Sequence, residues 1–350
     1  MDKQNNFPLQ NVSWVKIGGN ALEFIECKSD TEFKEILKES FSKGSKFEIL
    51  GWGANTLISD NGIDSTVIKN SSNQIDILGK GNVEITSSDK EDEKEISDSR
   101  FVTLKSDGTF RGIEFKDLDY DESDKEIVKV KVSSGLSLPM AINTLINRGL
   151  TGLQWFSGIP GQMGAAVYNN IHGGTHLLSE YIDSVDILTP DGIEQTYSNE
   201  DMKFKYDESI LHTNKGIITA VTLKLKLGDK DKALYTSREW AKRKISQPKN
   251  SLGSTFKNIS KEEQMRLGFP TPSIGYLVEH KLMMSGYRVG DAQIAPTSNN
   301  FIINLGHAKA SDYLEIIKKV KKESYEKFGL TLVPEIFFKG FSNDELKEIL

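Results

Sequence analysis

Apolar and polar residues follow two periods along this chain, and these periods predict where helices and strands lie. A first helix is expected after Ser29-Asp30-Thr31-Glu32, which has the spacing of a capping box. Its apolar face would consist of Phe33, Ile36, Leu37 and Phe41, which recur at helical spacing. A short strand is expected over 47–50, directly before a glycine-containing loop.

Further elements alternate along the rest of the chain. Strict alternation predicts a strand over 128–132, and Ser137 begins a helix that Gly149 ends. A helix capped by Ser311 or Asp312 is expected to stop at Gly329. The other expected strands are 66–68, 184–188 and 217–227. The fold class indicated is α/β or α+β, and no internal repeat is visible.

One long stretch, 70–125, has a different composition. The runs SSDKEDEKEISDSR at 87–100 and DLDYDESDKE at 117–126 are charged and polar throughout. They could form an acidic interaction surface, but their mixed signs favour a solvated insertion between strands. The polar link 228–232 is read as a domain boundary.

The composition excludes several classes of protein. The 350 residues are 37% hydrophobic and 27% charged, which suits two or three globular domains. The net charge is −6 and no Lys/Arg stripe is present, so a nucleic-acid partner is not expected. The five histidines have no ligand spacing, so no metal site is expected.

Cysteine usage and hydropathy point to the cytoplasm. The single cysteine, Cys27, lies in an apolar run and cannot form an intramolecular disulfide. No signal peptide and no apolar run of membrane-spanning length are visible, so no membrane partner is expected. We expect a monomer of the cytoplasm.

Two glycine-rich loops carry the candidate chemistry. The first is 51–56, GWGANT, and the second is 157–166, SGIPGQMGAA. Glycines let the backbone approach a ligand closely and direct N–H groups at phosphate oxygens. Either loop alone could be a tight turn, but two are better explained by a dinucleotide diphosphate held between two subdomains.

These loops and several other segments resemble the UDP-N-acetylenolpyruvoylglucosamine reductase family along nearly the whole chain and in the same order. The segments are KIGGNA (16–21), GWGANTLISD (51–60), GLQWFSGIPGQMGAAVYNN (152–170), FKYDESIL (204–211), RKISQP (243–248), GSTFKN (253–258), GYRVGDAQIAPTSNNFIIN (286–304) and KFGLTLVPEIFFKG (327–340).

The resemblance implies an α+β (α/β mixed) fold, with a two-subdomain FAD-binding part of the vanillyl-alcohol-oxidase type and a C-terminal α+β substrate domain. The implied domains are 1–70 joined by 335–350, then 71–228, then 229–334. FAD would be held by Gly51, Gly53, Ala54, Asn55, Thr56, Gly158, Ile159, Pro160, Gly161, Gly164 and Ala165.

The implied reaction belongs to peptidoglycan precursor synthesis. NADPH reduces FAD, a hydride then goes to C3 of the enolpyruvyl ether and a proton to C2, and UDP-N-acetylmuramate results. The family's proton donor falls on Ser254 in GSTFKN. Its glutamate falls on Glu335, which would position and polarise the enolpyruvyl group. Without the resemblance, Ser254 could be an ordinary loop serine and Glu335 an exposed strand residue.

The sequence departs from the family at one catalytic position. The segment 204–209 reads FKYDES, so Asp207 stands where the family has an arginine. A reversed charge at about 4 Å would cost roughly 2–8 kcal/mol. If the stretch is extended, Lys205 lies on the same face and could supply the charge; Arg243 or Arg288 could also do so.

The remaining implied contacts concern the UDP-sugar, with Arg243, Asn258 and Asn300 as substrate-binding candidates. The short link 227–243 resembles family members without the long tyrosine-bearing loop. The leading hypothesis is an NADPH-dependent reductase. Because of Asp207, two alternatives stay open, a flavin-binding relative with impaired catalysis and an oxidoreductase with another substrate.

Overall fold

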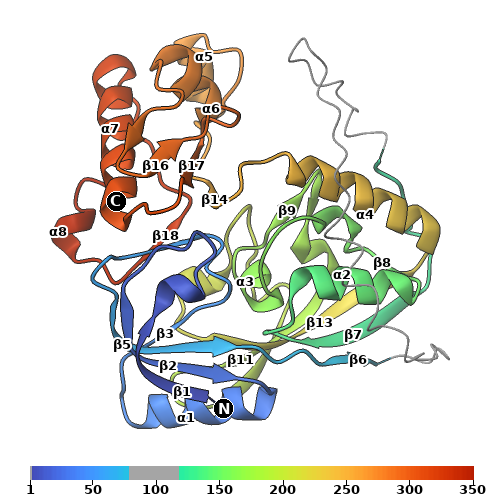
Figure 1. The fold of residues 1–350 in the computed structure, drawn as a ribbon. Helices are drawn as coiled ribbons and strands as arrows, with labels where there is room; N and C mark the ends of the chain where they lie inside the picture. Colours follow the sequence, from blue (N-terminus) through green and yellow to red (C-terminus); the bar gives the residue numbers. More distant parts are fainter. Residues whose placement is uncertain (1, 79–117) are drawn as a thin grey trace. The chain divides into compact units, whose positions relative to one another are not determined.

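The computed structural model describes residues 2–78 and 118–350, and these form two compact units that are each built from separate chain segments (Figure 1). Unit 1 comprises Met1–Glu26, Lys46–Lys69 and Gln247–Leu350, and unit 2 comprises Cys27–Ser45 and Asn70–Ser246. The chain therefore leaves unit 1 twice and returns to it twice.

The sheets of unit 1 are small. One has the order β1-β2-β5-β3, with β1 Asp2–Pro8, β2 Asn20–Cys27, β5 Ile63–Asn70 and β3 Phe47–Ile49. An antiparallel sheet has the order β14-β17-β16-β15, with β14 Ser251–Ser254, β17 Phe301–Asn304, β16 Ala292–Ile294 and β15 Arg288–Val289. Strand β18, Phe337–Lys339, pairs in parallel with β4, Thr56–Ile58.

Helix α7, Ala310–Phe328, packs on β15 and β16 of unit 1 (Figure 1). It buries Tyr313, Ile316, Ile317 and Val320 in a core shared with these strands. The other helical segments of this unit are η1 Leu9–Asn11, α5 Lys261–Leu267, α6 Ile274–Tyr276, η6 Leu277–Lys281 and α8 Asn343–Leu346.

Unit 2 is built on a six-stranded sheet with the order β12-β11-β13-β7-β6, in which β8 also pairs with β13. Its strands are β6 Ile75–Ile77, β7 Ile127–Ser133, β8 Leu150–Thr151, β11 Ile182–Leu188, β12 Glu194–Ser198 and β13 Ile217–Leu227. The hairpin β9, His172–Gly173, and β10, His176–Leu177, lies apart from this sheet.

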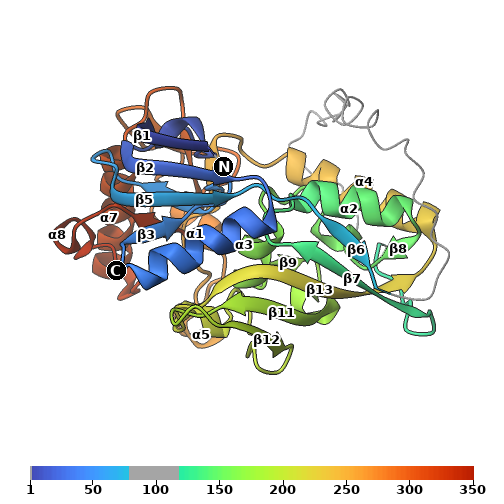
Figure 2. The ribbon, with the colours of Figure 1, turned by 90° about the horizontal axis from the view of Figure 1, so that it is seen from below.

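Helices α2, Leu138–Asn147, and α4, Lys230–Ile245, lie side by side along this sheet (Figure 2). Helix α1, Asp30–Ser42, contacts β13. The remaining helical segments of unit 2 are η3 Gln154–Phe156, α3 Met163–Tyr168, η4 Leu178–Tyr181 and η5 Ile210–His212.

Several expected elements are confirmed. Helix α1 begins after Ser29, whose side chain accepts the Glu32 amide at 3.2 Å. Helix α2 has Ser137 as its cap, and the alternating stretch is β7. Local patterns sufficed here because each cap and each apolar face lie within the same stretch of chain.

The start of α7 is a correction. Neither Ser311 nor Asp312 is the cap, because the helix begins at Ala310 after Lys309. The first amides of this helix instead donate to Asp60, from Ala310 N to Oδ1 at 2.7 Å and from Ser311 N to Oδ2 at 3.0 Å. A carboxylate at a helix amino terminus satisfies these amides and suits the helix dipole. Residue 60 is too distant in sequence for a local pattern to show this.

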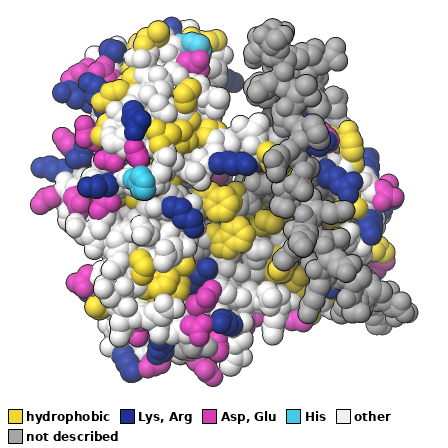
Figure 3. Space-filling model, in the orientation of Figure 1, with side chains coloured by type: hydrophobic (Ala, Val, Ile, Leu, Met, Phe, Trp, Pro, Cys, Tyr) yellow, Lys and Arg dark blue, Asp and Glu magenta, His cyan; other side chains and the backbone are white. Residues whose placement is uncertain are grey.

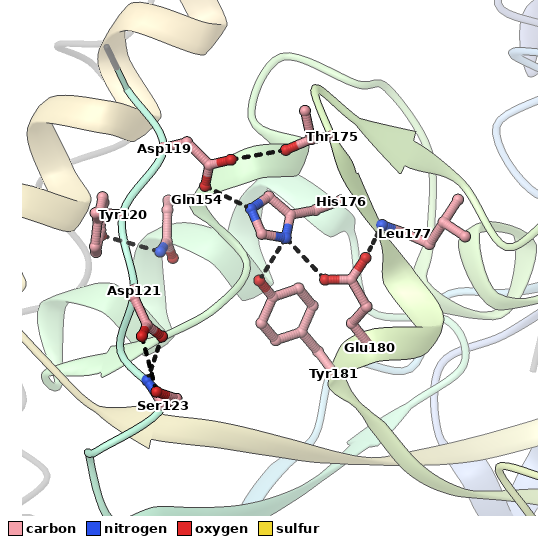
Figure 4. Close-up of polar contacts among 10 residues, drawn as sticks. All are labelled: Asp119, Tyr120, Asp121, Ser123, Gln154, Thr175, His176, Leu177, Glu180 and Tyr181. Atoms are coloured by element: carbon pink, nitrogen blue, oxygen red, sulfur yellow. Dashed lines mark hydrogen bonds and ion pairs between the residues drawn. The ribbon is translucent and has the colours of Figure 1, made fainter. Parts of the chain in front are cut away.

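The second half of the charged stretch is largely solvated, as expected, since Asp119, Asp121 and residues 123–126 are exposed, but it is also held at several points. The run 87–100 lies outside the described residues. Residues 118–126 are tied to unit 2 by side chains rather than solvated throughout (Figure 4). Asp119 pairs with His176 Nε2 at 3.0 Å, and Tyr120 accepts from Gln154 at 3.0 Å. Glu122 accepts from Thr151 at 2.6 Å.

The division of the chain into two compact units does not test the expected division into three domains, which stays a prediction. The link 228–232 lies within unit 2, where Asp229 caps α4 and accepts from the Lys232 amide. Among the described residues no helix has the length and apolar character of a membrane span. On the face shown in Figure 3, described basic and acidic side chains are interspersed, as their near balance in the sequence suggests.

Candidate active site

Ser254 is the last residue of β14 in unit 1. It pairs with Phe301 of β17, and its side chain is half-buried. The next residue, Thr255, donates its amide to the Asn300 carbonyl at 2.7 Å. The backbone on either side of Ser254 is therefore held by β17. The Ser254 hydroxyl makes no hydrogen bond to another described residue, which suits a group that meets a ligand.

Glu335 lies beside this strand on its other edge. Its amide donates to the Thr255 carbonyl at 2.9 Å, and Phe256 pairs with Pro334. Glu335 is half-buried and precedes β18 rather than lying within it. The structure thus brings the two catalytic candidates, 81 positions apart in the sequence, onto adjacent backbone segments.

The first glycine-rich loop joins the same part of unit 1. The Asn55 side chain donates to the Glu335 carbonyl at 3.3 Å, and the Asn55 carbonyl accepts from Phe337 at 2.9 Å. Strand β4 then continues from Thr56 alongside β18. The first glycine-rich loop therefore ends beside the backbone segment that contains Glu335.

This loop offers backbone donors to a ligand. Among the described residues, no acceptor pairs with the amides of Gly51 through Asn55. Gly53 has φ 62°, and a Cβ there would stand 3.4 Å from Ser13 Cα. A left-handed glycine among consecutive unpaired amides is typical of an anion cradle, so these residues fit the diphosphate of a dinucleotide.

The second glycine-rich loop, in unit 2, uses its glycines differently. A Cβ at Gly158 would lie 2.7 Å from Lys244 Cβ, and one at Gly164 would lie 2.9 Å from Ser134 Cβ. These two glycines permit close packing on α4 and on the chain after β7. Gly161, with φ 142°, has open space at its Cβ position and accepts from Leu138 at 2.9 Å. Of the loop's predicted FAD ligands, Gly158 and Ala165 are exposed, whereas Ile159, Pro160, Gly161 and Gly164 are half-buried.

The three substrate-binding candidates have different surroundings. Asn300 pairs with the backbone of Phe256 through both ends of its amide, at 3.1 Å and 2.8 Å. It therefore holds the backbone that follows Ser254. Asn258 Oδ1 accepts from Ile274 at the start of α6 at 3.4 Å. Arg243, at the end of α4 in unit 2, lies over the Trp240 ring at 4.8 Å. Their roles toward a UDP-sugar stay predictions.

The turn that carries Asp207 is not extended. The condition under which Lys205 could supply the charge of the family arginine is therefore not met. Lys205 and Glu208 pair across it, with Tyr206 and Asp207 at its tip. Asp207 has φ 53°, a left-handed conformation that aspartate tolerates better than most residues. Arg288, in unit 1, donates to Gly290 at 2.6 Å and to Asp291 at 2.5 Å.

Asp207 has a histidine partner that the sequence did not indicate. Its Oδ1 lies 3.1 Å from Nδ1 of His172. The Tyr206 hydroxyl lies 3.1 Å from Nε2 of the same ring, and the two rings stack at 4.6 Å. The 35 positions that separate His172 from Asp207 form no known ligand spacing, so sequence reasoning passed over it. The resemblance at FKYDES pointed to Asp207 but not to its partner His172.

Known proteins of one family match this chain over most of its length. The model of the UDP-N-acetylenolpyruvoylglucosamine reductase C-terminal domain matches residues 246–338. The reductase of that name from Anoxybacillus flavithermus is 30% identical over 333 residues, which are 93% of this chain and 90% of the relative. The Bacillus subtilis reductase is 30% identical, with 95% and 92% covered. The chain belongs to the UDP-N-acetylenolpyruvoylglucosamine reductase family.

A solved structure agrees with the fold. The crystal structure of the reductase MurB from Thermus caldophilus superposes with a TM-score of 0.67 at 27% identity, and 97% of this chain and 98% of that one are covered. The expected mixed α+β architecture is therefore confirmed. The family model also spans Ser254, Asn258, Asn300 and Glu335, the candidates that unit 1 brings together.

Proposed function

We propose that this protein is an FAD-dependent oxidoreductase that reduces UDP-N-acetylenolpyruvoylglucosamine to UDP-N-acetylmuramate with NADPH. One observation carries the proposal. Ser254 and Glu335 are held side by side through the hydrogen bond from Glu335 N to Thr255 O at 2.9 Å. Relatives that match this chain over most of its length are named as reductases of this substrate, which supports the proposal. No feature of the described residues favours the two alternatives over this activity.

The residues proposed to hold FAD follow from the loops. The open amides of Gly51, Gly53, Ala54 and Asn55 would bind phosphate oxygens, and Thr56 begins the strand that fixes them. From the second loop we propose Gly158, Ile159, Pro160, Gly161, Gly164 and Ala165. When bound, FAD supplies the hydride that it has received from NADPH.

The chain's own residues supply the proton and the charge stabilisation. Reduction adds a hydride and a proton across the enol-ether double bond, so the intermediate carries negative charge before the proton arrives. Ser254 would hold the proton at Oγ and donate it to carbon. Because a serine hydroxyl is a weak acid, this donation depends on fixed geometry, which β17 provides from one side and Glu335 from the other.

Assembly and location follow from the same proposal. Both the UDP-sugar and NADPH are cytoplasmic metabolites, so we propose a cytoplasmic enzyme. We also propose that it acts as a monomer, with neither nucleic acid nor membrane as a partner and without a metal ion. Gel filtration with light scattering of the flavin-loaded protein should give the mass of one chain, 39.1 kDa before the cofactor.

Anaerobic stopped-flow absorbance tests the proposed activity. Purified protein loaded with FAD is reduced by NADPH and then mixed with UDP-N-acetylenolpyruvoylglucosamine. We expect rapid return of the oxidised flavin band and formation of UDP-N-acetylmuramate, identified by mass. Flavin that is reduced but stays reduced in the presence of the sugar would refute the proposed substrate. Protein that binds no flavin would refute the cofactor.

A further inference from the structure

Gln162, in the second glycine-rich loop of unit 2, has a side chain whose two polar ends are used differently. Its Nε2 donates to two backbone carbonyls, that of Asn70 at 2.6 Å and that of Gly135 at 2.6 Å. These two bonds use both hydrogens of the amide nitrogen, so the nitrogen and the oxygen of the side chain cannot exchange places. The orientation of the Gln162 amide group is therefore fixed by unit 2 itself.

The two carbonyls that hold Gln162 belong to closely packed backbone. Asn70 is 5% exposed, and its side chain donates to Ser134 Oγ at 2.9 Å and accepts from the Ser72 amide at 3.0 Å. A Cβ at Gly135 would stand 2.7 Å from Asn70 Cγ, so these two segments lie against each other. Gln162 is thus anchored on a buried polar network rather than on exposed side chains.

Backbone hydrogen bonds hold the loop on either side of Gln162. The Gly161 carbonyl accepts from the Leu138 amide, and the Met163 amide donates to the Leu136 carbonyl, both at 2.9 Å. Gly161 itself has φ 142° and open space at its Cβ position. Gln162 therefore lies in a fastened segment, and the space beside it at Gly161 is not filled by another side chain.

The oxygen of the same side-chain amide is unused. Gln162 is 5% exposed, yet its Oε1 accepts from no residue that the structure describes and keeps some contact with solvent. Within the ranges 2–78 and 118–350, the backbone amides of Gly161 and Gln162 likewise have no acceptor. The loop thus offers one fixed acceptor and, next to it in the chain, two backbone donors.

This set of groups suits a different part of the cofactor from the diphosphate. A phosphate group takes hydrogen-bond donors, and an amide oxygen would repel it. An imide edge, which has an N–H between two carbonyls, instead needs one acceptor flanked by donors. The isoalloxazine ring of oxidised FAD has such an edge at N3–H, and the uracil of a UDP-sugar has one of the same kind.

We propose that Gln162 is a cofactor-binding residue that accepts a hydrogen bond from the imide N3–H of the flavin through Oε1. The carbonyls of Asn70 and Gly135 position it by holding Nε2. The flavin is favoured over uracil because Gln162 lies within 157–166, the loop already proposed to hold FAD. This inference rests on the proposed function and adds to it a side chain that recognises the ring of the cofactor.

The wild-type protein provides the first test, with FAD and with 3-methyl-FAD, in which a methyl group replaces the N3 hydrogen. Each flavin is titrated into the apoprotein, and the change in flavin fluorescence gives the Kd. We expect 3-methyl-FAD to bind about tenfold more weakly, since one hydrogen bond to a fixed acceptor is lost. Equal affinity for the two flavins would overturn the proposal without any change to the protein.

Gln162→Met removes the acceptor and keeps the length of the side chain. We expect the variant to bind FAD about tenfold more weakly than the wild type and to bind FAD and 3-methyl-FAD equally well. It also leaves two buried carbonyls without their donor, so urea denaturation of the apoprotein should show a loss of stability. A purely structural role would weaken both flavins by the same factor and keep the difference between them. If the variant does not fold, the wild-type comparison decides.

Asn199 offers a matched control in the same unit. Its Nδ2 donates to the carbonyls of Ser179 and Ile182, both at 2.8 Å, which is the kind of anchorage that holds Gln162. Asn199→Leu should also lose stability but keep the wild-type affinity for FAD and the preference over 3-methyl-FAD. Loss of that preference in Asn199→Leu would overturn the assignment to Gln162, because the preference would then depend on the general state of unit 2.

The outcomes separate this inference from the proposed function. If the wild type binds no FAD, the proposed cofactor fails, and this inference fails with it. If the wild type binds FAD and reduces the enolpyruvyl sugar, but Gln162→Met keeps the preference for FAD over 3-methyl-FAD, only the inference is overturned. A Gln162→Met protein that binds FAD normally but UDP-N-acetylmuramate more weakly would assign Gln162 to uracil and would overturn it as well.

Discussion

Ser254 and Asp207 occupy two candidate catalytic positions that are built by different means. In unit 1, the backbone near Ser254 is held on both edges, by Asn300 on one side and by Glu335 on the other. In unit 2, the turn at Asp207 is completed by side chains, since its carboxylate contacts His172 and the ring contacts Tyr206. One position is fixed by a backbone ladder, and the other by a set of partners.

This difference predicts that the two positions tolerate different changes. A backbone ladder positions a side chain without using its functional group. The Ser254 hydroxyl therefore stays available, and replacing the serine would remove it. A set of side-chain partners can exchange one member for another if the partners adjust. We propose that Asp207 is such an exchange, since its carboxylate contacts the His172 ring at 3.1 Å.

The largest effect should come from Ser254→Ala. The backbone hydrogen bonds of Thr255 remain, so flavin reduction by NADPH should be unchanged, while reoxidation by the sugar should slow by about 10² to 10⁴ because the proton donor is lost. Stopped-flow absorbance of both half-reactions measures this. Ser260→Ala, which changes only a helix cap, is the control and should keep both rates. Equal slowing of the two half-reactions would show that Ser254 is not the donor.

Asn300→Ala should weaken the ladder itself. Phe256 is 3% exposed, and the variant removes the partners of its amide and its carbonyl. We expect a loss of about 2 kcal/mol in the free energy of unfolding, since buried polar groups would lack partners. Urea denaturation measures it. Asn258→Ala removes one longer contact of 3.4 Å and should cost less. A fall in substrate affinity without a fall in stability would indicate direct contact with the UDP-sugar instead.

Asp207→Arg restores the family residue and tests the exchange directly. We expect kcat/KM for the sugar to fall about tenfold rather than rise. The arginine would adopt a φ of 53°, which costs about 1 kcal/mol, and His172 would lose its carboxylate partner. Steady-state kinetics at pH 6.5 measures this, with Lys205→Gln as an exposed control on the same turn. A higher kcat/KM in the arginine variant would break the comparison.

The smallest effect should come from Asp119→Asn, at another contact made by side chains. Burial raises the pKa of Asp119, but hydrogen bonds from His176 and Thr175 outweigh it and hold that pKa below its ordinary value. Because folding lowers the pKa, this contribution to stability is present above about pH 4 and is lost as the pH falls through the folded-state pKa.

The variant should therefore reduce stability by less than about 1 kcal/mol at pH 7, because the Asp119 side chain is 39% exposed. The difference from the wild type should shrink on acidification, as thermal unfolding at pH 7 and pH 3 would show. A difference that grew toward pH 3 would contradict the sign of this pKa shift.

The sequence by itself determined the local elements and the segments that carry the resemblance. Ser29 and Ser137 cap helices because the capping side chain and the amide that it accepts lie three residues apart. GSTFKN and LVPE identified Ser254 and Glu335, because those residue types in those segments match the family. The glycine-rich loops were likewise visible, since glycine marks where a backbone must bend or approach.

Only the tertiary structure decided how distant segments complete one another. Asp60 satisfies the first amides of α7, and Asn55 contacts the backbone of Glu335. His172 meets Asp207 because a hairpin and a turn from separate stretches of chain pack together. Hydrogen bonds and ion pairs act over about 3 to 4 Å in space whatever the separation along the chain, so no periodicity or motif records them.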